Sequence, residues 1–418
     1  MNTTSKTFCV YPWTHQMIDT NGAVKLCCVA EDPTKKEHGQ HMTITKNKLS
    51  NLWNDPYMQD IRQRMLNGKM VKDCGQCYRK ERRGEYSFRQ RVNEGMQIKD
   101  PQILVKDLPY YLDIRFGNLC NLKCRMCTGI YSKKFGEELE SIADQDEEFK
   151  TLASSSAKGY TFDWYENANF WDDLKNYLPY VKQLYLTGGE PTLVQGNYDF
   201  LQQLIDKGYS KNIALIFNTN VTNFQQRFLD TINQFKQVTL NLSIDGVGGV
   251  QEYIRFPSKW NHVKNNMKLL MSKIKESNCN FHLVFTPTVS IMNVANFNKF
   301  VDWAYKFSLL NNTENNSWDM QPILLHGPQF QDIIYSNTDY RYYALKQLEQ
   351  VDRGALVDFG ALRIFYDHVV DTLKNKFENE PESIMFRKQL QKWNTAIDKS
   401  RGIDIQDYIP YSQLLYEQ

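Results

Sequence analysis

Three cysteines stand close together in the run from Asn118 to Cys127, with three residues between the first two and two between the last two. They are Cys120, Cys124 and Cys127. A structural zinc ion or a saturated iron–sulfur cluster takes four protein ligands, so three thiolates on one tight loop are one too few. Three cysteines can instead hold three irons of a [4Fe–4S] cluster and leave the fourth iron open to a small molecule. The alternative is a zinc knuckle whose fourth ligand lies elsewhere in the chain.

Length and composition favour a globular protein of two or three domains. The chain has 418 residues, of which 41% are hydrophobic and 23% are charged, so we expect a packed core. The net charge of +2 does not indicate the strongly basic surface that binds nucleic acid or an anionic membrane. We therefore expect neither a nucleic-acid partner nor a membrane partner.

The N-terminal sequence and the cysteine content indicate the cellular compartment of the protein and the use of its cysteines. No apolar run approaches the length of a transmembrane helix, and residues 1–8 lack the apolar core of a signal peptide. We therefore expect a cytoplasmic protein, in which thiols stay reduced. Nine cysteines there indicate metal or redox use rather than disulfides. Only Cys279 lies beyond residue 128, and it reads as a small buried apolar residue.

From about residue 105, short β-rich runs alternate with helix-length segments. The expected strands are Tyr110–Phe116, Gln183–Thr187, Ile213–Phe217, Val238–Ile244, Phe281–Thr286 and Asp319–Leu325. The expected helices between them lie near 133–142, 197–207, 223–235, 260–276 and 294–307. Such alternation predicts an α/β fold with a parallel sheet, built as a partial (β/α)6 TIM-like barrel that is open on one side. Residues 130–170 read as a long insertion.

The two ends of the chain differ from this pattern. Residues 1–100 hold five cysteines and few clear strands, with helices expected at Leu49–Trp53 and Pro56–Leu66, and an exposed helix or linker at Arg79–Asn93. The C-terminal tail is expected to be helical at Tyr340–Asp352, Leu362–Phe377 and Met385–Ile397. The predicted domains are a Cys-rich module at 1–100, the partial barrel at 105–328 and a helical extension at 329–418.

Polar motifs follow several of the expected strands, where parallel α/β folds place their sites. The second strand ends in the turn Gly188-Gly189-Glu190-Pro191. Two glycines permit close backbone approach, and a carboxylate beside them suits an ammonium group. Taken alone, this run is only a turn.

The third and fourth strands end in further candidates. Asn220 closes the third strand, and Ser243 and Asp245 close the fourth, two residues apart and so on one face of a strand. These two side chains can hydrogen-bond ribose hydroxyls. Arg255 can hold a carboxylate through two parallel hydrogen bonds. The alternative is a strand-end turn at Asp245 and a surface arginine at position 255.

The three-cysteine loop followed one βα unit later by Gly188–Glu190 resembles the radical S-adenosylmethionine (radical SAM) superfamily. The resemblance implies that Cys120, Cys124 and Cys127 hold a SAM-binding [4Fe–4S] cluster. It also implies the SAM contacts: the glycine–glutamate turn for the methionine amino group, and polar residues after the third and fourth strands for the rest. Met126 stands where the family often has an aromatic residue that packs on adenine. The implied SAM-contacting residues are Gly188, Gly189, Glu190, Asn220, Ser243, Asp245, Arg255 and Met126.

The N-terminal cysteines carry a second resemblance. Cys9, Gly22 and Cys27, followed by Cys74 and Cys77, are similar to the SPASM/twitch domains, which bind auxiliary [4Fe–4S] clusters. The ligands implied for a second, auxiliary [4Fe–4S] cluster are Cys9, Cys27, Cys74 and Cys77. Cys28 could replace Cys27. The alternative is a zinc ribbon made by the pairs Cys27/Cys28 and Cys74/Cys77. In the best-known members this module follows the barrel, whereas here it precedes it.

The family resemblance implies an enzyme that cleaves SAM reductively, so that a 5′-deoxyadenosyl radical removes a hydrogen atom from a substrate. Members with an auxiliary cluster commonly act on peptides or proteins, which makes such a substrate the expectation. The alternatives are a small metabolite or nucleotide-sugar substrate, or a non-catalytic zinc or iron–sulfur scaffold. An electron donor such as flavodoxin or ferredoxin is the expected partner. No side chain is assigned a catalytic role beyond the cluster, and no motif indicates a role for residues 329–418.

Overall fold

The computed structural model describes residues 6–31, 42–84, 86–96, 108–153, 159–375 and 380–416. The chain divides into two compact units. The first comprises residues 1–118, 161–216 and 234–236, and the second comprises residues 119–160, 217–233 and 237–418. Each unit is described by itself. The domain boundaries expected from the sequence follow a different division and stay a prediction.

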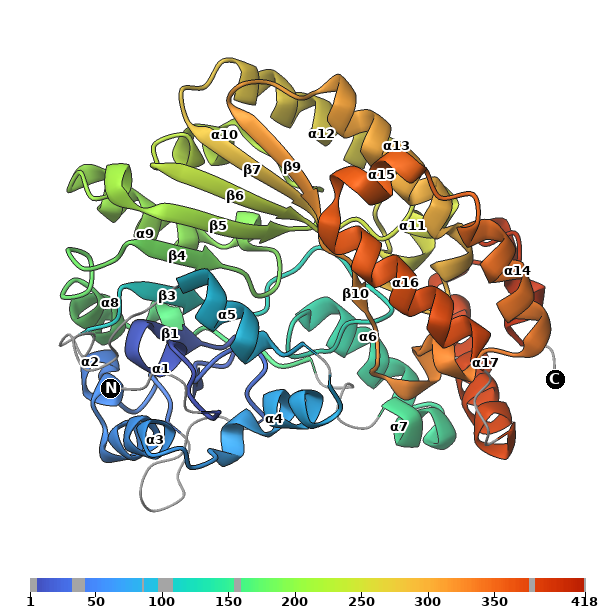
Figure 1. Ribbon diagram of the computed structural model, residues 1–418, viewed down its shortest axis with the longest axis horizontal. Coiled ribbons are helices and arrows are strands. Elements are labelled where there is room, and N and C mark those ends of the chain that lie inside the picture. Colours follow the sequence, from blue (N-terminus) through green and yellow to red (C-terminus); the bar gives the residue numbers. More distant parts are fainter. Residues whose placement is uncertain are drawn as a thin grey trace. The chain divides into compact units, whose positions relative to one another are not determined.

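The first unit holds the N-terminal segment and the first strands of the parallel sheet (Figure 1). Its helices are α1 (Tyr11–Thr14), α2 (Leu49–Trp53), α3 (Pro56–Leu66), α4 (Gly75–Arg82), α5 (Phe88–Met96), α8 (Ala168–Leu174) and α9 (Gln195–Asp206). Its strands are β1 (His15–Ile18), β2 (Val24–Lys25), β3 (Tyr111–Ile114), β4 (Gln183–Leu186) and the start of β5 (Ala214–Thr219).

Strand β1 extends the sheet at its β3 edge. It forms a hairpin with antiparallel β2 and pairs in parallel with β3, from His15 opposite Tyr111 to Ile18 opposite Ile114. The sequence of this region predicts few clear strands and none in the sheet. All four residues of β1 and of β3 are buried, as expected for strands covered on both faces. The Cys-rich segment therefore shares a sheet with the first predicted barrel strand.

The second unit holds the remaining strands and the helical C-terminal region. Its helices are α6 (Lys133–Ala143), α7 (Glu147–Ala153), α10 (Gln226–Ile232), α11 (Gly249–Ile254), α12 (Trp260–Lys275), α13 (Phe297–Leu310), α14 (Thr338–Leu348), α15 (Arg353–Asp358), α16 (Gly360–Lys374) and α17 (Glu380–Arg401). Its strands are the end of β5, β6 (Gln237–Leu242), β7 (Asn280–Phe285), β8 (Thr288–Val289), β9 (Asn316–Met320) and β10 (Ile323–Leu324).

The strands confirm the predicted α/β class. Their order is β2-β1-β3-β4-β5 in the first unit and β5-β6-β7-β9 in the second, so the sheet has eight strands and is mostly parallel. Strands β3, β4, β5, β6, β7 and β9 lie in chain order across this sheet, as the βα alternation predicts. Helix α13 packs on β7, where the ring of Phe285 lies 6.1 Å from that of Phe300 and 5.8 Å from that of Trp303.

Two local expectations need correction. The strand expected at Asp319–Leu325 is split, because β9 pairs with β7 while β10 joins β8 in a separate two-stranded sheet. Pro322 lies between the two strands and has no N–H to donate to a ladder. The segment Arg79–Asn93 is two helices, and Arg89 within it is buried against Glu81 rather than exposed.

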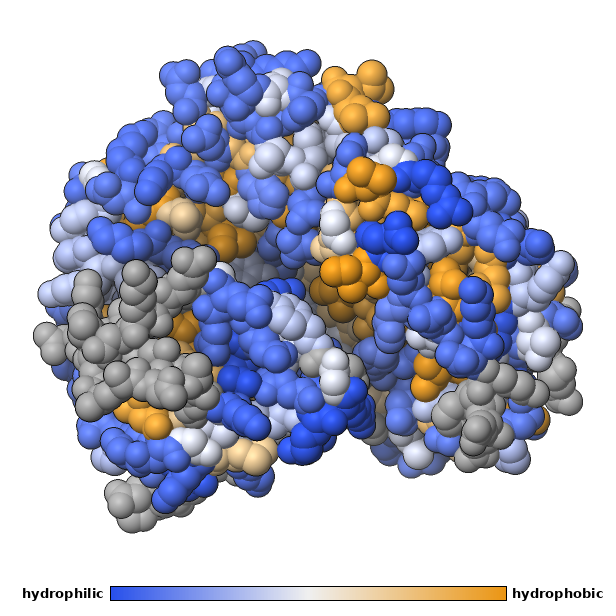
Figure 2. Space-filling view, viewed as in Figure 1, coloured by the Kyte–Doolittle hydropathy of each residue, from blue (hydrophilic) through white to orange (hydrophobic). Residues whose placement is uncertain are grey.

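The other predicted helices are confirmed to within a few residues, including those of the C-terminal tail, and the end predicted at Phe377 lies outside the described residues. Hydrophobic surface lies over α15 and α16 in Figure 2, where Val357 and Ile364 are 77% and 76% exposed. Within the described ranges, no helix combines the length and the apolarity needed to cross a membrane. Cys279 is buried, as predicted.

Candidate functional site

The three-cysteine loop lies in the second unit. Cys120 and Cys124 are each only 9% exposed, and Cys127 is half-buried. Leu122 packs between the first two cysteines, and Met126 packs against the same cluster. The backbone N–H of Leu122 points at Cys120 Sγ, 3.4 Å away, as expected for a loop shaped to stabilise a thiolate. The loop therefore gathers its three thiols in a largely buried setting.

Arg255 and Asp245 form a buried ion pair beside this loop. Arg255 Nε lies 2.6 Å from Asp245 Oδ2, and its Nη2 lies 3.0 Å from Oδ1. The remaining nitrogen, Nη1, lies 4.0 Å from Cys124 Sγ. The backbone N–H of Thr288 also donates to Asp245 Oδ1, at 2.8 Å. The two residues predicted to contact SAM separately thus contact each other, and Arg255 contacts a candidate cluster ligand.

Asn220 contacts the cysteine loop. Its Nδ2 lies 2.9 Å from the Oδ1 of Asn121, which stands between Cys120 and Cys124. Asn121 Nδ2 donates to Thr222 Oγ1 at 2.7 Å, and that hydroxyl donates to Asn220 Oδ1, which closes a ring of three side chains. The next residue, Val221, is buried with φ = 64°. This left-handed backbone is strained for a β-branched residue, and such strain gathers at functional sites.

Ser243 and Asp245 lie beyond the end of β6, which stops at Leu242. The expectation that strand alternation places both side chains on one face is therefore wrong, because neither residue belongs to the strand. Ser243 is half-buried, and its hydroxyl has no hydrogen-bond partner among the residues that the structure describes. Asp245 is 1% exposed.

The glycine–glutamate turn lies in the first unit, after β4. Gly188 has φ = +125°, and a Cβ added there would lie 3.0 Å from the carbonyl oxygen of Gly117, so only glycine suits this position. Glu190 is 1% exposed. Its Oε1 accepts hydrogen bonds from the backbone N–H and the hydroxyl of Thr192, at 3.2 and 2.7 Å. The carboxylate therefore caps the short 3₁₀ helix Pro191–Leu193.

The N-terminal cysteines of the first unit form a second cluster of thiols. Cys9 and Cys77 act electrostatically on each other, and Cys74 is within range of both. Cys27 is within range of Cys9 and Cys74. Beyond burial, the pKa of Cys28 responds most to Asp113 and Arg115 of the β3 region. Each of Cys9, Cys27, Cys74 and Cys77 thus lies within electrostatic range of at least one other of the four, and Cys28 lies within range of Cys27.

The donor chemistry of both cysteine groups fits an iron–sulfur cluster. Burial raises the pKa of Cys9 and of Cys127 to about 12, and that of Cys27 well above its usual range. Buried thiols of this kind keep their protons until a metal supplies positive charge, and metal binding then releases them. Within the described ranges, no three His, Cys, Asp or Glu side chains converge tightly enough to bind one metal ion.

Sequence reasoning missed Arg125, which stands between Cys124 and Cys127 and is fully buried. It also missed Asn121 and Thr222. The signal for Arg125 was available, because a charged residue inside a buried loop requires a counter-charge. The partner could not be found from the sequence, since Asp398 lies 273 residues away.

Family models match two parts of the chain. Residues 114–301 match the radical SAM superfamily, and residues 9–78 match the SPASM iron–sulfur cluster-binding domain. These domains imply a SAM-binding [4Fe–4S] cluster and auxiliary cluster binding. No curated protein matches the chain.

Among solved structures, the chain is similar to native anSMEcpe with bound AdoMet, at 16% identity and a TM-score of 0.35, over 61% of this chain and 60% of that chain. It is also similar to Streptococcus suis SuiB bound to its precursor peptide SuiA, at 12% identity and a TM-score of 0.34, over 66% of this chain and 60% of that chain. The chain thus spans about three fifths of these proteins. Likenesses this distant carry no argument about substrate. The two family models identify a radical SAM domain preceded by a SPASM domain.

Proposed function

We propose that this protein is a radical SAM enzyme that modifies a peptide or protein. The observation that carries the proposal is the buried loop of Cys120, Cys124 and Cys127, one thiol short of a saturated site, with Arg255 beside Cys124. When bound, the cluster and SAM would supply the reductive cleavage of SAM and the removal of a hydrogen atom from the substrate.

The chain's own residues would bind the cluster and SAM and hold them in place. The three thiols would hold the cluster, and Asp245 would orient Arg255 through their paired hydrogen bonds. The Gly188–Glu190 turn would receive the SAM ammonium, for which a buried carboxylate is suited. Met126 and Ser243 would contact the nucleoside. Asn220 would position the loop through Asn121, in place of a direct contact with SAM.

The peptide substrate is supported by the SPASM match at residues 9–78 and by the gathering of Cys9, Cys27, Cys74 and Cys77. Four thiolates saturate a cluster, so this second site would have no open iron for SAM. We propose that it is an auxiliary [4Fe–4S] cluster serving the substrate radical, and that a flavodoxin or ferredoxin supplies electrons in the cytoplasm.

The test is SAM cleavage by the anaerobically purified, chemically reduced protein, with products identified by mass spectrometry. We expect 5′-deoxyadenosine and methionine, formed slowly without substrate. Cys127→Ala should abolish both products, whereas Cys279→Ala, which removes a buried cysteine outside both groups, should keep them. Methyl-transfer or hydrolytic products from the unaltered protein would contradict the proposal.

A further inference from the structure

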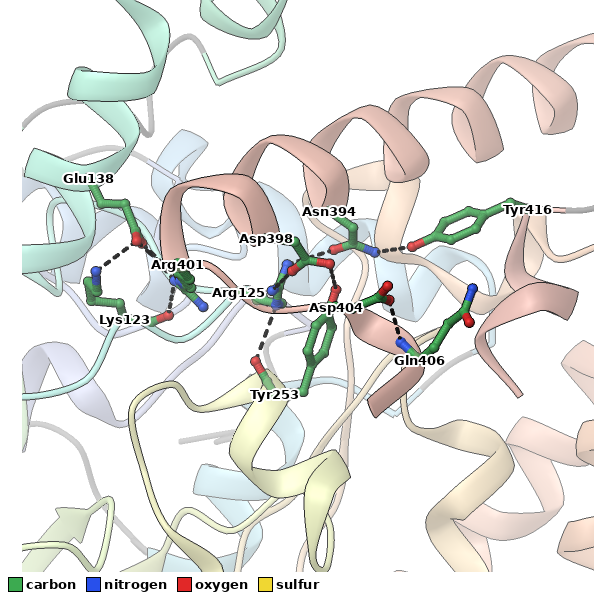
Figure 3. A network of polar contacts seen from close by, with 10 residues as sticks. All are labelled: Lys123, Arg125, Glu138, Tyr253, Asn394, Asp398, Arg401, Asp404, Gln406 and Tyr416. Carbon is green, nitrogen blue, oxygen red and sulfur yellow. Dashed lines mark hydrogen bonds and ion pairs between the residues drawn. The ribbon is translucent and has the colours of Figure 1, made fainter. Parts of the chain in front are cut away.

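Helix α17, near the C-terminus, presents a polar stripe to the cysteine loop. Its apolar residues Phe386, Leu390, Trp393 and Ile397 are buried at helical spacing. Asn394, Asp398 and Arg401 follow at intervals of four and three residues, so they share one face of the helix. Figure 3 shows these three side chains pointing toward residues that flank Cys124. The stripe therefore joins the C-terminal region to the candidate cluster loop.

Arg125, one residue after Cys124, is held by this stripe. Its side chain is completely buried. Nη1 lies 3.1 Å from Asn394 Oδ1, Nη2 pairs with Asp398, and Nε lies 3.2 Å from the carbonyl oxygen of Tyr253. The guanidinium also lies 3.6 Å from the centre of the Tyr253 ring, whose hydroxyl donates to Asp398 Oδ2 at 3.1 Å. Every nitrogen of the guanidinium has a partner, which a buried cation requires.

Lys123, one residue before Cys124, is held by the end of the same helix. Arg401 Nη2 lies 2.7 Å from the Lys123 carbonyl oxygen and 2.7 Å from Glu138 Oε2. Lys123 Nζ lies 2.7 Å from Glu138 Oε1. The guanidinium of Arg401 lies 4.6 Å from the centre of the Phe256 ring. The residues on both sides of Cys124 are thus tied to α17, Lys123 through its carbonyl oxygen and Arg125 through its side chain.

Each cation in this region faces a carboxylate. Asp398 faces Arg125 and Asp245 faces Arg255, while Glu138 faces both Arg401 and Lys123. Each pair is mostly or wholly buried, where charges interact more strongly than in water. Loss of one carboxylate would therefore leave a positive charge next to the loop. The potential of an iron–sulfur cluster responds to such charges.

We propose that α17 clamps the three-cysteine loop, and that Asp398 and Arg401 are positioning residues that fix Cys124 and set the charge around the cluster. This gives residues 329–418 a role in the SAM site. The inference rests on the proposed function only in that the loop carries a cluster. The clamp itself is a property of the chain.

The test compares three variants of the full-length, anaerobically purified protein. Asp398→Asn keeps the side-chain shape and removes the charge. Arg401→Lys keeps the charge and removes the paired hydrogen bonds. Lys399→Gln changes an exposed neighbour and is the control. Hydrogen exchange of residues 119–128 and the midpoint potential of the cluster are measured on each, with a thermal melt to establish that the variant is folded.

We expect exchange in the loop to be about tenfold faster in Asp398→Asn and in Arg401→Lys, since local opening no longer breaks buried polar contacts. The potential should become more positive in Asp398→Asn, because the uncompensated Arg125 stabilises the reduced cluster, and should stay unchanged in Arg401→Lys. Variants that match Lys399→Gln in both measurements would overturn the clamp.

The two proposals fail separately. If the unaltered protein does not cleave SAM but the variants differ in loop exchange as expected, the proposed enzyme function fails and the clamp stands. If the unaltered protein cleaves SAM but all variants have identical loop exchange, the clamp fails and the proposed enzyme function stands. Should Asp398→Asn not fold, Arg401→Lys still decides the question through loop exchange.

Discussion

At the scale of single residues, buried charges near the candidate site contact partners of opposite charge. The sequence suggested separate ligand contacts for Asp245 and Arg255, but two hydrogen bonds of 2.6 and 3.0 Å join them. A buried guanidinium without a carboxylate would be costly to desolvate, and Asp245 meets this requirement for Arg255. Arg255 can therefore still face an anionic ligand with Nη1, while Asp245 holds its orientation.

Glu190→Gln should weaken SAM binding by about 1.5–3 kcal/mol, because it removes a charge-assisted hydrogen bond to the ammonium group. The amide oxygen can still accept the hydrogen bonds from Thr192, so the fold should be kept. Calorimetric titration of SAM into the cluster-loaded protein measures the change. An unchanged dissociation constant would remove Glu190 from the SAM site.

His15 and Asp113 should give opposite pH dependences of stability. Burial lowers the pKa of His15 to about 3 from 6.5, so the unfolded chain binds more protons below 6.5 and stability falls as the pH falls. Burial, partly offset by Arg115, raises the pKa of Asp113 to about 7 from 3.8, so the folded chain binds more protons between these values and stability falls as the pH rises.

In the unaltered protein the two effects offset each other between about pH 4 and 6.5. His15→Asn should leave stability falling with rising pH, and Asp113→Asn should leave it rising, each by up to about 1.4 kcal/mol per pH unit. Urea unfolding at several pH values between 5 and 7 measures the slopes. Parallel curves for the two variants would show that these groups titrate alike in both states.

At the scale of elements, helix α5 fastens the Cys9 segment. Asn93 accepts a hydrogen bond from the Val10 N–H at 2.9 Å and donates to the Phe8 carbonyl oxygen at 2.9 Å, so it holds the residues on both sides of Cys9. Arg89 donates to the same carbonyl at 2.6 Å. The second pair of cysteines starts helix α4, with Cys74 as its N-cap and Cys77 in its first turn. Neither helix contributes to the β1–β3 ladder.

Cys74→Ala/Cys77→Ala should therefore keep SAM cleavage while losing modification of a peptide substrate. The sheet and the Gly188–Glu190 turn do not depend on these thiols, whereas a substrate radical would lose its electron acceptor. Chromatography of 5′-deoxyadenosine beside mass spectrometry of the peptide separates the two outcomes. Normal modification of the peptide by this variant would show that the N-terminal cysteine module has only a structural role. Zinc bound at these cysteines in the unaltered protein would favour the zinc-ribbon alternative.

At the scale of the whole molecule, each compact unit holds one group of cysteines. The first unit has the four N-terminal thiols, and the second has the three-cysteine loop. Each group is built from contacts within its own unit, so each should load with iron independently.

We expect about eight irons per chain, from two [4Fe–4S] clusters. Replacing Cys120, Cys124 and Cys127 together with alanine should remove about half of the iron, because the four N-terminal thiols remain. Iron and sulfide analysis of anaerobically purified protein measures the loss, with Cys279→Ala as the variant that keeps full iron. Retention of all the iron in the triple variant would show that the loop holds no cluster.

The sequence by itself determined the local features. The cysteine spacings, the Gly188–Glu190 turn and the strand–helix alternation each depend on residues a few positions apart, whose periodicity and backbone preferences can be read directly. For this reason α2 and α3 were predicted to the residue. The same reading failed at residues 319–325, where pairing partners rather than propensity divide β9 from β10.

Only the tertiary structure decided which polar groups meet. Asp245 pairs with Arg255, β1 joins β3, and Asp398 reaches Arg125 across 273 positions of sequence. These contacts follow from the need to neutralise charge and satisfy hydrogen bonds wherever packing buries them. A sequence shows that a buried arginine requires a partner, but only the packing of helix α17 shows which residue supplies it.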